Sequence, residues 1–245
     1  MAAATHAGRV AIVTGAGRGI GAAIAAELAA RGAKVAALEA DPALARQAGA
    51  ILCDVADRDA VDAACTRVEA EFGPVDILVN NAGISPKHDG RAAPAFEMDP
   101  AEWDRVLAVN LTGAWNLVRR LTPGMVAQRW GRIVNQSSIA GKAFTPIVGC
   151  HYAATKAALI GLTRHLAGEL GPHGITVNAI APGRIATPMV AVAGGATNAA
   201  VVAETPLRRL GTPEEVARAA CFLTGPDAEF VTGQTIDVAG GWMMT

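Results

Sequence analysis

The sequence carries almost no net charge and contains no long apolar run. Its 21 lysines and arginines are balanced by 22 aspartates and glutamates, which gives a formal net charge of −1. This balance offers no electrostatic reason to bind nucleic acid or an anionic membrane surface, so we expect neither as a partner. No stretch resembles an uninterrupted membrane span, and the first residues lack the charged-then-apolar order of a secretion signal. We therefore expect a cytoplasmic protein.

Paired cysteine motifs are also absent. The four cysteines, Cys53, Cys65, Cys150 and Cys221, are widely spaced and form no Cys-x-x-Cys. They are typical of reduced, mostly buried thiols. Cys150 precedes His151, but adjacent residues on a helix point in different directions and no second cluster of ligands exists. We expect no metal site, and we expect this pair to border a substrate pocket.

Glycine, by contrast, is abundant, with 27 residues. A short apolar run, Arg9–Thr14, leads into Gly15-Ala-Gly-Arg-Gly-Ile-Gly21 and then into an alanine-rich helical pattern. Strand, glycine-rich turn and helix together bring a pyrophosphate against a helix N-terminus, because glycine lets backbone amides approach the phosphates. The spacing differs from the standard Gly-x-Gly-x-x-Gly fingerprint. A purely structural loop is the alternative, but the context favours dinucleotide binding.

Strand-like and helix-like segments alternate without repeats or a low-complexity linker. The predicted strands are Val10–Thr14, Lys34–Leu38, Ala50–Asp54, Ile77–Asn80, Arg132–Gln136, Thr176–Ala181 and Thr235–Val238. The predicted helices are Ile20–Arg31, Arg58–Phe72, Ala101–Gln128, Ala153–Leu170 and Pro213–Leu223, with Pro123 expected to end or bend the third. The alternation predicts an α/β fold: one doubly wound, Rossmann-type domain over residues 1–245, with a mainly parallel seven-stranded sheet and helices on both faces. Length alone would also allow two domains.

The strongest chemical signal is Tyr152 and Lys156, with Ser138 fourteen residues before the tyrosine. Residues four apart share one face of a helix, so the phenol and the ammonium can reach the same small volume. A neighbouring cation favours the phenolate and lowers the pKa of the phenol from about 10, which gives a usable acid and base. The Ser138 hydroxyl could hold a carbonyl or alcohol oxygen. Alone, the Tyr-x-x-x-Lys pair arises by chance on many helices.

The motifs as a set resemble the short-chain dehydrogenases/reductases. The resemblance covers Arg9 to about Trp242 and is closest to 3-oxoacyl-carrier-protein reductase-like members and secondary-alcohol dehydrogenases. It rests on the order and spacing of Thr14-Gly-x-x-x-Gly-x-Gly21, Asn80-Asn-Ala-Gly83, Asn110, Ser138, Tyr152-x-x-x-Lys156 and Pro182-Gly183. It implies hydride transfer between a nicotinamide cofactor and a secondary alcohol or ketone.

The resemblance also implies the site residues. Ser138 would polarise the substrate oxygen, Tyr152 would exchange its proton, and Lys156 would lower the Tyr152 pKa and bind the nicotinamide ribose. Asn110 would hold a water that links the lysine to solvent, and Ser137 could in principle replace Ser138. The implied catalytic residues are Asn110, Ser138, Tyr152 and Lys156; the implied cofactor-binding residues are Gly15, Gly17, Arg18, Gly19, Ile20, Gly21, Glu39, Asp54, Val55, Asn81, Ala82, Gly83, Tyr152, Lys156, Pro182, Gly183, Ile185 and Thr187.

Glu39 decides the expected cofactor. It directly follows the second predicted strand, Lys34–Leu38, about twenty residues after the glycine loop, where a carboxylate can accept hydrogen bonds from ribose hydroxyls and repel a 2′-phosphate. This favours NAD. Arg18 indicates the opposite, because a basic residue there contacts the 2′-phosphate of NADP in similar reductases; otherwise it is a solvated side chain. NADP therefore stays possible.

The substrate is expected to be a small or medium apolar secondary alcohol or ketone. An NADPH-dependent 3-oxoacyl-[acyl-carrier-protein] or acyl-CoA reductase is the alternative, with Arg129 as a docking residue for a carrier, although His173 stands where similar enzymes often place a second basic residue. A non-catalytic dinucleotide-binding scaffold and an epimerase or dehydratase that uses NAD transiently also stay open. By resemblance we expect a homotetramer and a substrate lid around residues 188–206.

Overall fold

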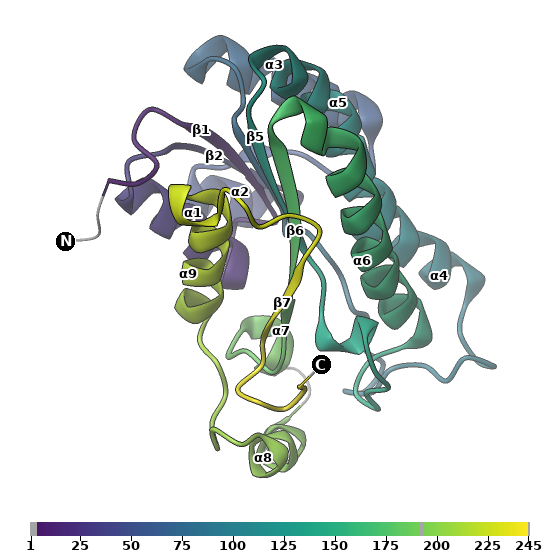
Figure 1. Ribbon diagram of the computed structural model, residues 1–245. Helices are drawn as coiled ribbons and strands as arrows, with labels where there is room; N and C mark the ends of the chain where they lie inside the picture. Colours follow the sequence, from purple (N-terminus) through teal and green to yellow (C-terminus); the bar gives the residue numbers. More distant parts are fainter. Residues whose placement is uncertain (1–3, 192–193, 245) are drawn as a thin grey trace.

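A seven-stranded sheet organises the molecule. The computed structural model describes residues 4–191 and 194–244, and of Ala196 only the backbone. The strand order is β3-β2-β1-β4-β5-β6-β7, and every neighbouring pair is parallel (Figure 1). The strands are β1 Val10–Thr14, β2 Lys34–Glu39, β3 Ile51–Leu52, β4 Ile77–Asn80, β5 Gly131–Gln136, β6 Ile175–Pro182 and β7 Thr235–Val238. The predicted doubly wound α/β fold is confirmed.

Helices cover both faces of this sheet (Figure 1). On one face α1 (Gly19–Ala30) packs beside α9 (Pro213–Thr224), and on the other lie α3 (Arg58–Phe72), α5 (Gly113–Gln128) and α6 (Cys150–Leu170). Each layer buries its own apolar cluster: Ile24, Leu28 and Val216 belong to the first, and Leu117 and Met125 to the second. Parallel strands covered on both faces read as continuous apolar runs, and all residues of β1, β4, β5 and β6 are buried.

The remaining helices are short or lie at the edges of the sheet. They are α2 (Pro42–Ala48), α4 (Pro100–Leu107), α7 (Pro188–Ala191) and α8 (Gly195–Glu204), with 3₁₀ turns at Ile139–Gly141, Gly171–His173 and Pro226–Ala228. Sequence patterning missed α2 because the helix has only 7 residues, about two turns. The Asp41 carboxylate accepts from two backbone amides, and Pro42 starts the helix. None of the described helices is long and apolar enough to span a membrane.

The long helix predicted for Ala101–Gln128 is divided, but not at Pro123. A π-helical turn, Ala108–Thr112, separates α4 from α5, and α5 continues through Pro123. Pro123 is exposed, so the carbonyl that loses its helical partner can reach water, while buried Leu121 and Met125 keep the helix on the sheet. The third predicted strand is also shorter than Ala50–Asp54, since only Ile51 and Leu52 pair with β2.

The strand order reverses between β1 and β4, which continue in opposite directions across the sheet. Ligands of open α/β sheets bind beyond the carboxyl ends of the strands at such a point, because the loops there diverge and leave a crevice. The fold therefore directs the search for a site to this edge.

Candidate active site

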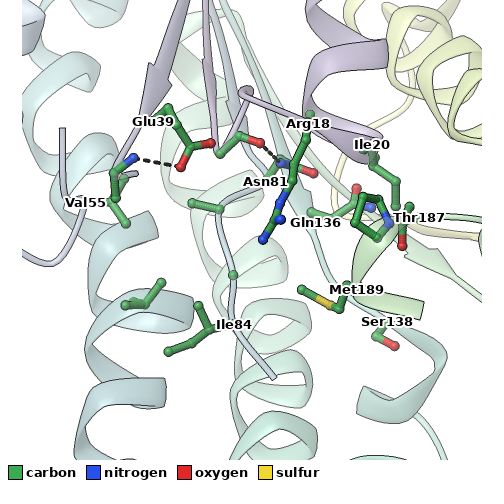
Figure 2. Close-up of a pocket in the computed structure, with 18 of the residues that line it drawn as sticks. Arg18, Ile20, Glu39, Val55, Asn81, Ile84, Gln136, Ser138, Thr187 and Met189 are labelled. Atoms are coloured by element: carbon green, nitrogen blue, oxygen red, sulfur yellow. Dashed lines mark hydrogen bonds between the residues drawn. The ribbon is translucent and has the colours of Figure 1, made fainter. Parts of the chain in front are cut away.

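A cavity of about 410 Å³ lies at the carboxyl ends of the strands. It is lined by the loops after β1 to β6 and by α6 (Figure 2). All of the predicted cofactor residues line it except Gly17, and Ser138 does as well. The lining residues that sequence reasoning missed are Ala40, Asp41, Leu44, Cys53, Ile84, Arg105, Val109 and Gln136. Ser137, named above as a possible replacement for Ser138, and residues 188–190 of the predicted lid line it as well. Ala40, Cys53, Ile84 and Val109 directly adjoin a predicted site residue, so adjacency was the available signal for these four.

The glycine loop has the shape of a phosphate cradle. Gly15 and Gly19 have φ of +62° and +60°, and a Cβ on Gly21 would lie 2.3 Å from the Gly15 carbonyl oxygen. Arg18, the N-cap of α1, gives no side-chain cap, so the first amides of the helix are left for another acceptor. Free amides and the positive end of the helix dipole suit a pyrophosphate, and the residues present therefore fit a dinucleotide.

Asn81 holds the glycine loop against the end of β4. Its side-chain amide donates to the carbonyls of Thr14 (2.8 Å) and Gly15 (3.1 Å), and the Thr14 hydroxyl accepts from the amides of Asn81 and Ala82, both at 3.0 Å. A Cβ on Gly15 would lie 2.9 Å from Ala82 Cα, so the close approach depends on glycine. The loops after the two central strands thus form one rigid floor.

Glu39 closes the edge of the cavity beyond the glycine loop. Its carboxylate accepts hydrogen bonds from the amides of Gly17 (3.0 Å), Ala40 (2.9 Å) and Asp41 (3.1 Å). Gly17 does not line the cavity but contributes through this contact. The carboxylate can come so close because residue 17 is glycine: a Cβ there would lie 2.7 Å from Glu39 Oε2. Arg18 extends from the loop into the same cavity (Figure 2). Glu39, which favours NAD, and Arg18, which favours NADP, therefore both lie at the site.

Asp54 and Val55 line the wall after β3. Asp54 Oδ1 accepts from the amide of Ala56 at 3.0 Å, and Oδ2 pairs with Arg105 at 2.8 Å. Arg105 comes from α4 and lines the cavity too. The ion pair is half exposed, so it contributes little to stability, but it fixes the position of the carboxylate.

The two adjacent serines have different partners. The buried Ser137 hydroxyl donates to the Lys156 carbonyl at 2.7 Å, which ties β5 to α6. Ser138 caps the 3₁₀ turn Ile139–Gly141, and its hydroxyl also hydrogen-bonds to Tyr152. The geometry distinguishes the two: Ser138 is the serine that shares the end of the cavity with the phenol.

Tyr152 and Lys156 meet at the wall of the cavity, where the lysine is buried and the tyrosine half-buried. The lysine Nζ lies 5.4 Å from the centroid of the phenol ring and donates to the Gln136 carbonyl at 2.6 Å. Burial raises the pKa of Tyr152, against the opposite effect of the Ser138 hydrogen bond, and burial lowers the pKa of Lys156 to about 8. The expectation that the lysine lowers the tyrosine pKa is not met in this structure, because removal from water dominates. The phenol stays protonated at neutral pH.

An anchored histidine fixes the start of α6. Gly149, the N-cap, has no side chain that could accept from the first amides of the helix. His151 Nδ1 accepts from one of them instead, the Tyr152 amide, at 2.7 Å. Its Nε2 then carries the proton and donates to Glu102 at 2.8 Å, while the other oxygen of Glu102 contacts His88 at 2.6 Å. His151 is fully buried and lines no part of the cavity, and Cys150 is exposed. The expectation that the pair borders the pocket is wrong, because neither residue lines the cavity; His151 positions the start of α6, the helix that carries Tyr152 and Lys156.

Asn110 lies behind the cavity rather than on its wall. It occupies the π-helical turn, and its side chain accepts from the Ile84 amide (2.8 Å) and donates to the Ile84 carbonyl (3.0 Å) and to Thr155 (3.2 Å). Gly83 lies between Asn110 and Lys156, since a Cβ built on this glycine would lie 3.4 Å from both Asn110 Oδ1 and Lys156 Nζ. The side chain therefore joins the loop after β4 to α6.

The segment after β6 forms the opposite wall. Pro182, Gly183, Ile185 and Thr187 line the cavity, and the Thr187 side chain lies 3.5 Å from a Cβ built on Gly19. The proposed lid, residues 188–206, begins with α7, whose Met189 and Val190 also line the cavity (Figure 2), and ends with α8. Its residues 192 and 193 lie outside the described residues.

Comparisons with known proteins agree with this geometry. Residues 15–243 match the family described as Enoyl-(Acyl carrier protein) reductase. The chain is 46% identical over 241 residues to acetoacetyl-CoA reductase from Rhizobium meliloti (strain 1021), covering 95% of this chain and 98% of the relative. The chain belongs to the short-chain dehydrogenases/reductases. It is an oxidoreductase whose site binds a nicotinamide dinucleotide.

Solved structures of this family share the whole fold. A crystal structure of 3-oxoacyl-[acyl-carrier protein] reductase from Brucella melitensis ATCC 23457 matches with 52% identity and a TM-score of 0.93, covering 99% of this chain and 94% of that one. A second Brucella melitensis 3-oxoacyl-[acyl-carrier protein] reductase, with bound NAD, matches with 50% identity and a TM-score of 0.92 at the same coverages.

Proposed function

We propose that this short-chain dehydrogenase/reductase transfers a hydride reversibly between NAD(H) and the carbon of a secondary alcohol or ketone, with Tyr152 as general acid and base. The observation that carries the proposal is the Ser138–Tyr152 hydrogen bond beside buried Lys156, at one end of a cavity whose other end is the glycine loop. A bound nicotinamide supplies or accepts the hydride, and the protein supplies orientation and the proton.

The protein residues divide the proton chemistry between them. During reduction the carbonyl carbon gains a hydride, and the electron pair of the C–O π bond takes a proton from the Tyr152 hydroxyl. Ser138 donates a hydrogen bond to the same oxygen and keeps it in line with the phenol. Lys156, charged at neutral pH, stabilises the phenolate that forms, and Asn110 keeps the loop after β4 against α6. Oxidation reverses these steps.

The preferred cofactor in this proposal is NAD. The Glu39 carboxylate is held by three backbone amides at the ribose edge of the cradle, and a 2′-phosphate would meet its negative charge. The Brucella melitensis structure with bound NAD supports the same choice. Arg18 could still offset the repulsion toward NADP, since it extends into the cavity.

A second candidate is reduction of 3-oxoacyl thioesters with NADPH. The names of the relatives favour it, because both acetoacetyl-CoA and 3-oxoacyl-carrier-protein reductases are among them. The carrier-docking role of Arg129 gains no support, since this residue lies at the amino end of β5, whereas the cavity lies beyond Gln136 at the carboxyl end. Its guanidinium donates to the Pro172 carbonyl instead.

An absorbance screen tests the proposed function. NADH and NADPH are each mixed with a panel of ketones, oxo acids and acetoacetyl-CoA, and loss of the reduced-nicotinamide band is recorded; NAD and NADP are tested with the matching alcohols. We expect turnover with NADH at lower cofactor concentrations than with NADPH. Binding of the cofactor without turnover of any carbonyl would support the non-catalytic scaffold instead.

We also propose a homotetramer. Trp115 on α5 and Phe222 on α9 are both 41% exposed, which leaves apolar surface on each face of the molecule. Sedimentation equilibrium at micromolar protein measures the assembly directly, and a monomer there would contradict the proposal.

A further inference from the structure

Two cations near the cavity have no role in the proposed hydride and proton transfers. Arg184 lies between Gly183 and Ile185, which both line the cavity. Its Nε donates to Asn198 Oδ1 on α8 at 2.9 Å, and the Asn198 amide donates to the Val190 carbonyl at 3.4 Å. Val190 is part of the cavity wall. These contacts hold the guanidinium beside the wall formed by α7.

One nitrogen of this guanidinium is unsatisfied within the described part of the chain. Arg184 Nη2 is buried and has no hydrogen-bond partner within residues 4–191 and 194–244, and no carboxylate of those residues pairs with it. Burial lowers the pKa of Arg184, which is the signature of a charge removed from water. A buried cation is costly unless it is paired, so a structural role alone does not explain it.

Lys87 approaches from the loop after β4. It follows Ile84, a residue of the cavity wall, by three positions, and its ammonium donates to the carbonyl of Ile147 on the loop before α6. Burial lowers the pKa of Lys87, and the charge of Arg184 lowers it further. Lys87 and Arg184 are thus near enough for the charge of one to act on the other. Each lies within three residues of the cavity wall in the sequence, and Arg184 itself lines a smaller neighbouring cavity of about 200 Å³.

Unpaired hydroxyls occur on the same two loops. Ser85 lies two residues before Lys87, and Thr145 lies two residues before Ile147. Within the part of the chain that the structure describes, the hydroxyls of Ser85 and Thr145 are buried without a hydrogen-bond partner. Buried polar groups are normally satisfied, so an unmet set of donors on converging segments indicates an acceptor that comes from outside the chain.

We propose that Arg184 and Lys87 bind a carboxylate of the substrate, so that the enzyme acts on short oxo acids and the corresponding hydroxy acids. An arginine fork binds a carboxylate through two parallel hydrogen bonds, and a lysine adds a point charge. The apolar alcohol or ketone favoured by the sequence would leave both cations without an anionic partner. The inference rests on the proposed function, because Ser138 and Tyr152 must hold the carbonyl oxygen of the same molecule. The carboxylate itself is unchanged in the reaction.

Matched acids and esters test this assignment. Pyruvate, acetoacetate and levulinate are compared with their methyl esters as substrates for reduction, which varies the separation of carbonyl and carboxylate. We expect wild-type kcat/KM for the best acid to exceed that of its ester by about 10- to 100-fold, the usual range for charged hydrogen bonds. Arg184→Gln and Lys87→Gln should each reduce this preference by about 10-fold or more, and Arg184→Lys should retain part of it. Arg67→Gln, on the exposed side of α3, is the control and should change neither value.

The outcomes separate the two proposals. Esters that react as well as the acids, no turnover of any acid, or an equal loss for acid and ester in Arg184→Gln would each overturn the carboxylate site. Another outcome would be that the two glutamine variants lose kcat/KM for acetoacetyl-CoA but not for acetoacetyl-N-acetylcysteamine, which lacks the phosphates. That result would assign the cations to the phosphates of a carrier and would also overturn the carboxylate site. If Tyr152→Phe retains full turnover, the proposed function fails whatever the acid preference; if that variant is inactive but the preference is absent, only the carboxylate site fails.

Discussion

Raising the pH from 7 to 9 should slow ketone reduction because Lys156 loses its charge. Burial lowers the pKa of this lysine to about 8, so about nine-tenths of the molecules carry the ammonium at pH 7 and about one-tenth at pH 9. Only the charged form stabilises the phenolate that Tyr152 becomes. We therefore expect kcat/KM for reduction to fall about tenfold over this range, measured by stopped-flow loss of NADH absorbance. Fluorescence titration of NADH at each pH corrects for changes in cofactor affinity.

The tyrosine can be followed separately in the same samples. Tyr152 is the single tyrosine of the chain, so the ultraviolet absorbance of tyrosinate reports on this residue alone. Burial raises the pKa of Tyr152, so we expect no tyrosinate to form over the pH range in which the rate falls. Tyrosinate appearing near pH 8 together with the loss of rate would assign the titration to Tyr152 and refute the reasoning. A rate that stays constant to pH 9.5 would refute it as well.

Three further substitutions test the cofactor cradle and the core. Glu39→Gln should shift the ratio of kcat/KM for NADPH over NADH upward by about 10- to 100-fold, because the charge opposite a 2′-phosphate is gone; Glu71→Gln on exposed α3 should leave the ratio unchanged. Gly21→Ala should weaken NADH binding at least ~10-fold in a fluorescence titration, since its Cβ would lie 2.3 Å from the Gly15 carbonyl oxygen, whereas Gly124→Ala meets open space and should bind normally. Leu117→Ala should lower the free energy of unfolding in urea by about 2–5 kcal/mol, while Phe96→Ala, 86% exposed, should stay within about 0.5 kcal/mol of wild type.

The sheet and its central helices could be predicted because their signals are local. Val10–Thr14, Ile77–Asn80 and Thr235–Val238 are continuous β-type runs between turn residues, and each matches its observed strand. Two features could not be predicted. The π-helical turn at Asn110 depends on hydrogen bonds to Ile84 and Thr155, which are distant in sequence, and α2 is too short to show a helical period.

The candidate site also has features that local sequence signals predicted and features that depend on distant segments. Spacing placed Ser138, Tyr152 and Lys156 in one volume, and their roles stay predictions that turnover must test. The pKa of the tyrosine could not be anticipated, because it depends on how completely the fold removes the phenol from water. Likewise, only the structure shows that Arg184 Nη2 is buried and without a partner among the described residues, while its Nε donates to Asn198. Burial and pairing between distant segments are properties of the fold rather than of a motif.

Turnover by Tyr152→Phe tests the central claim most directly. The substitution removes one hydroxyl, the proposed proton donor, and leaves the ring, Lys156 and the glycine loop in place. We predict that single-turnover oxidation of bound NADH by a ketone slows at least ~100-fold, while the dissociation constant for NADH stays within about threefold of wild type. Reduction at near wild-type rate in this variant would show that the proton comes from another group.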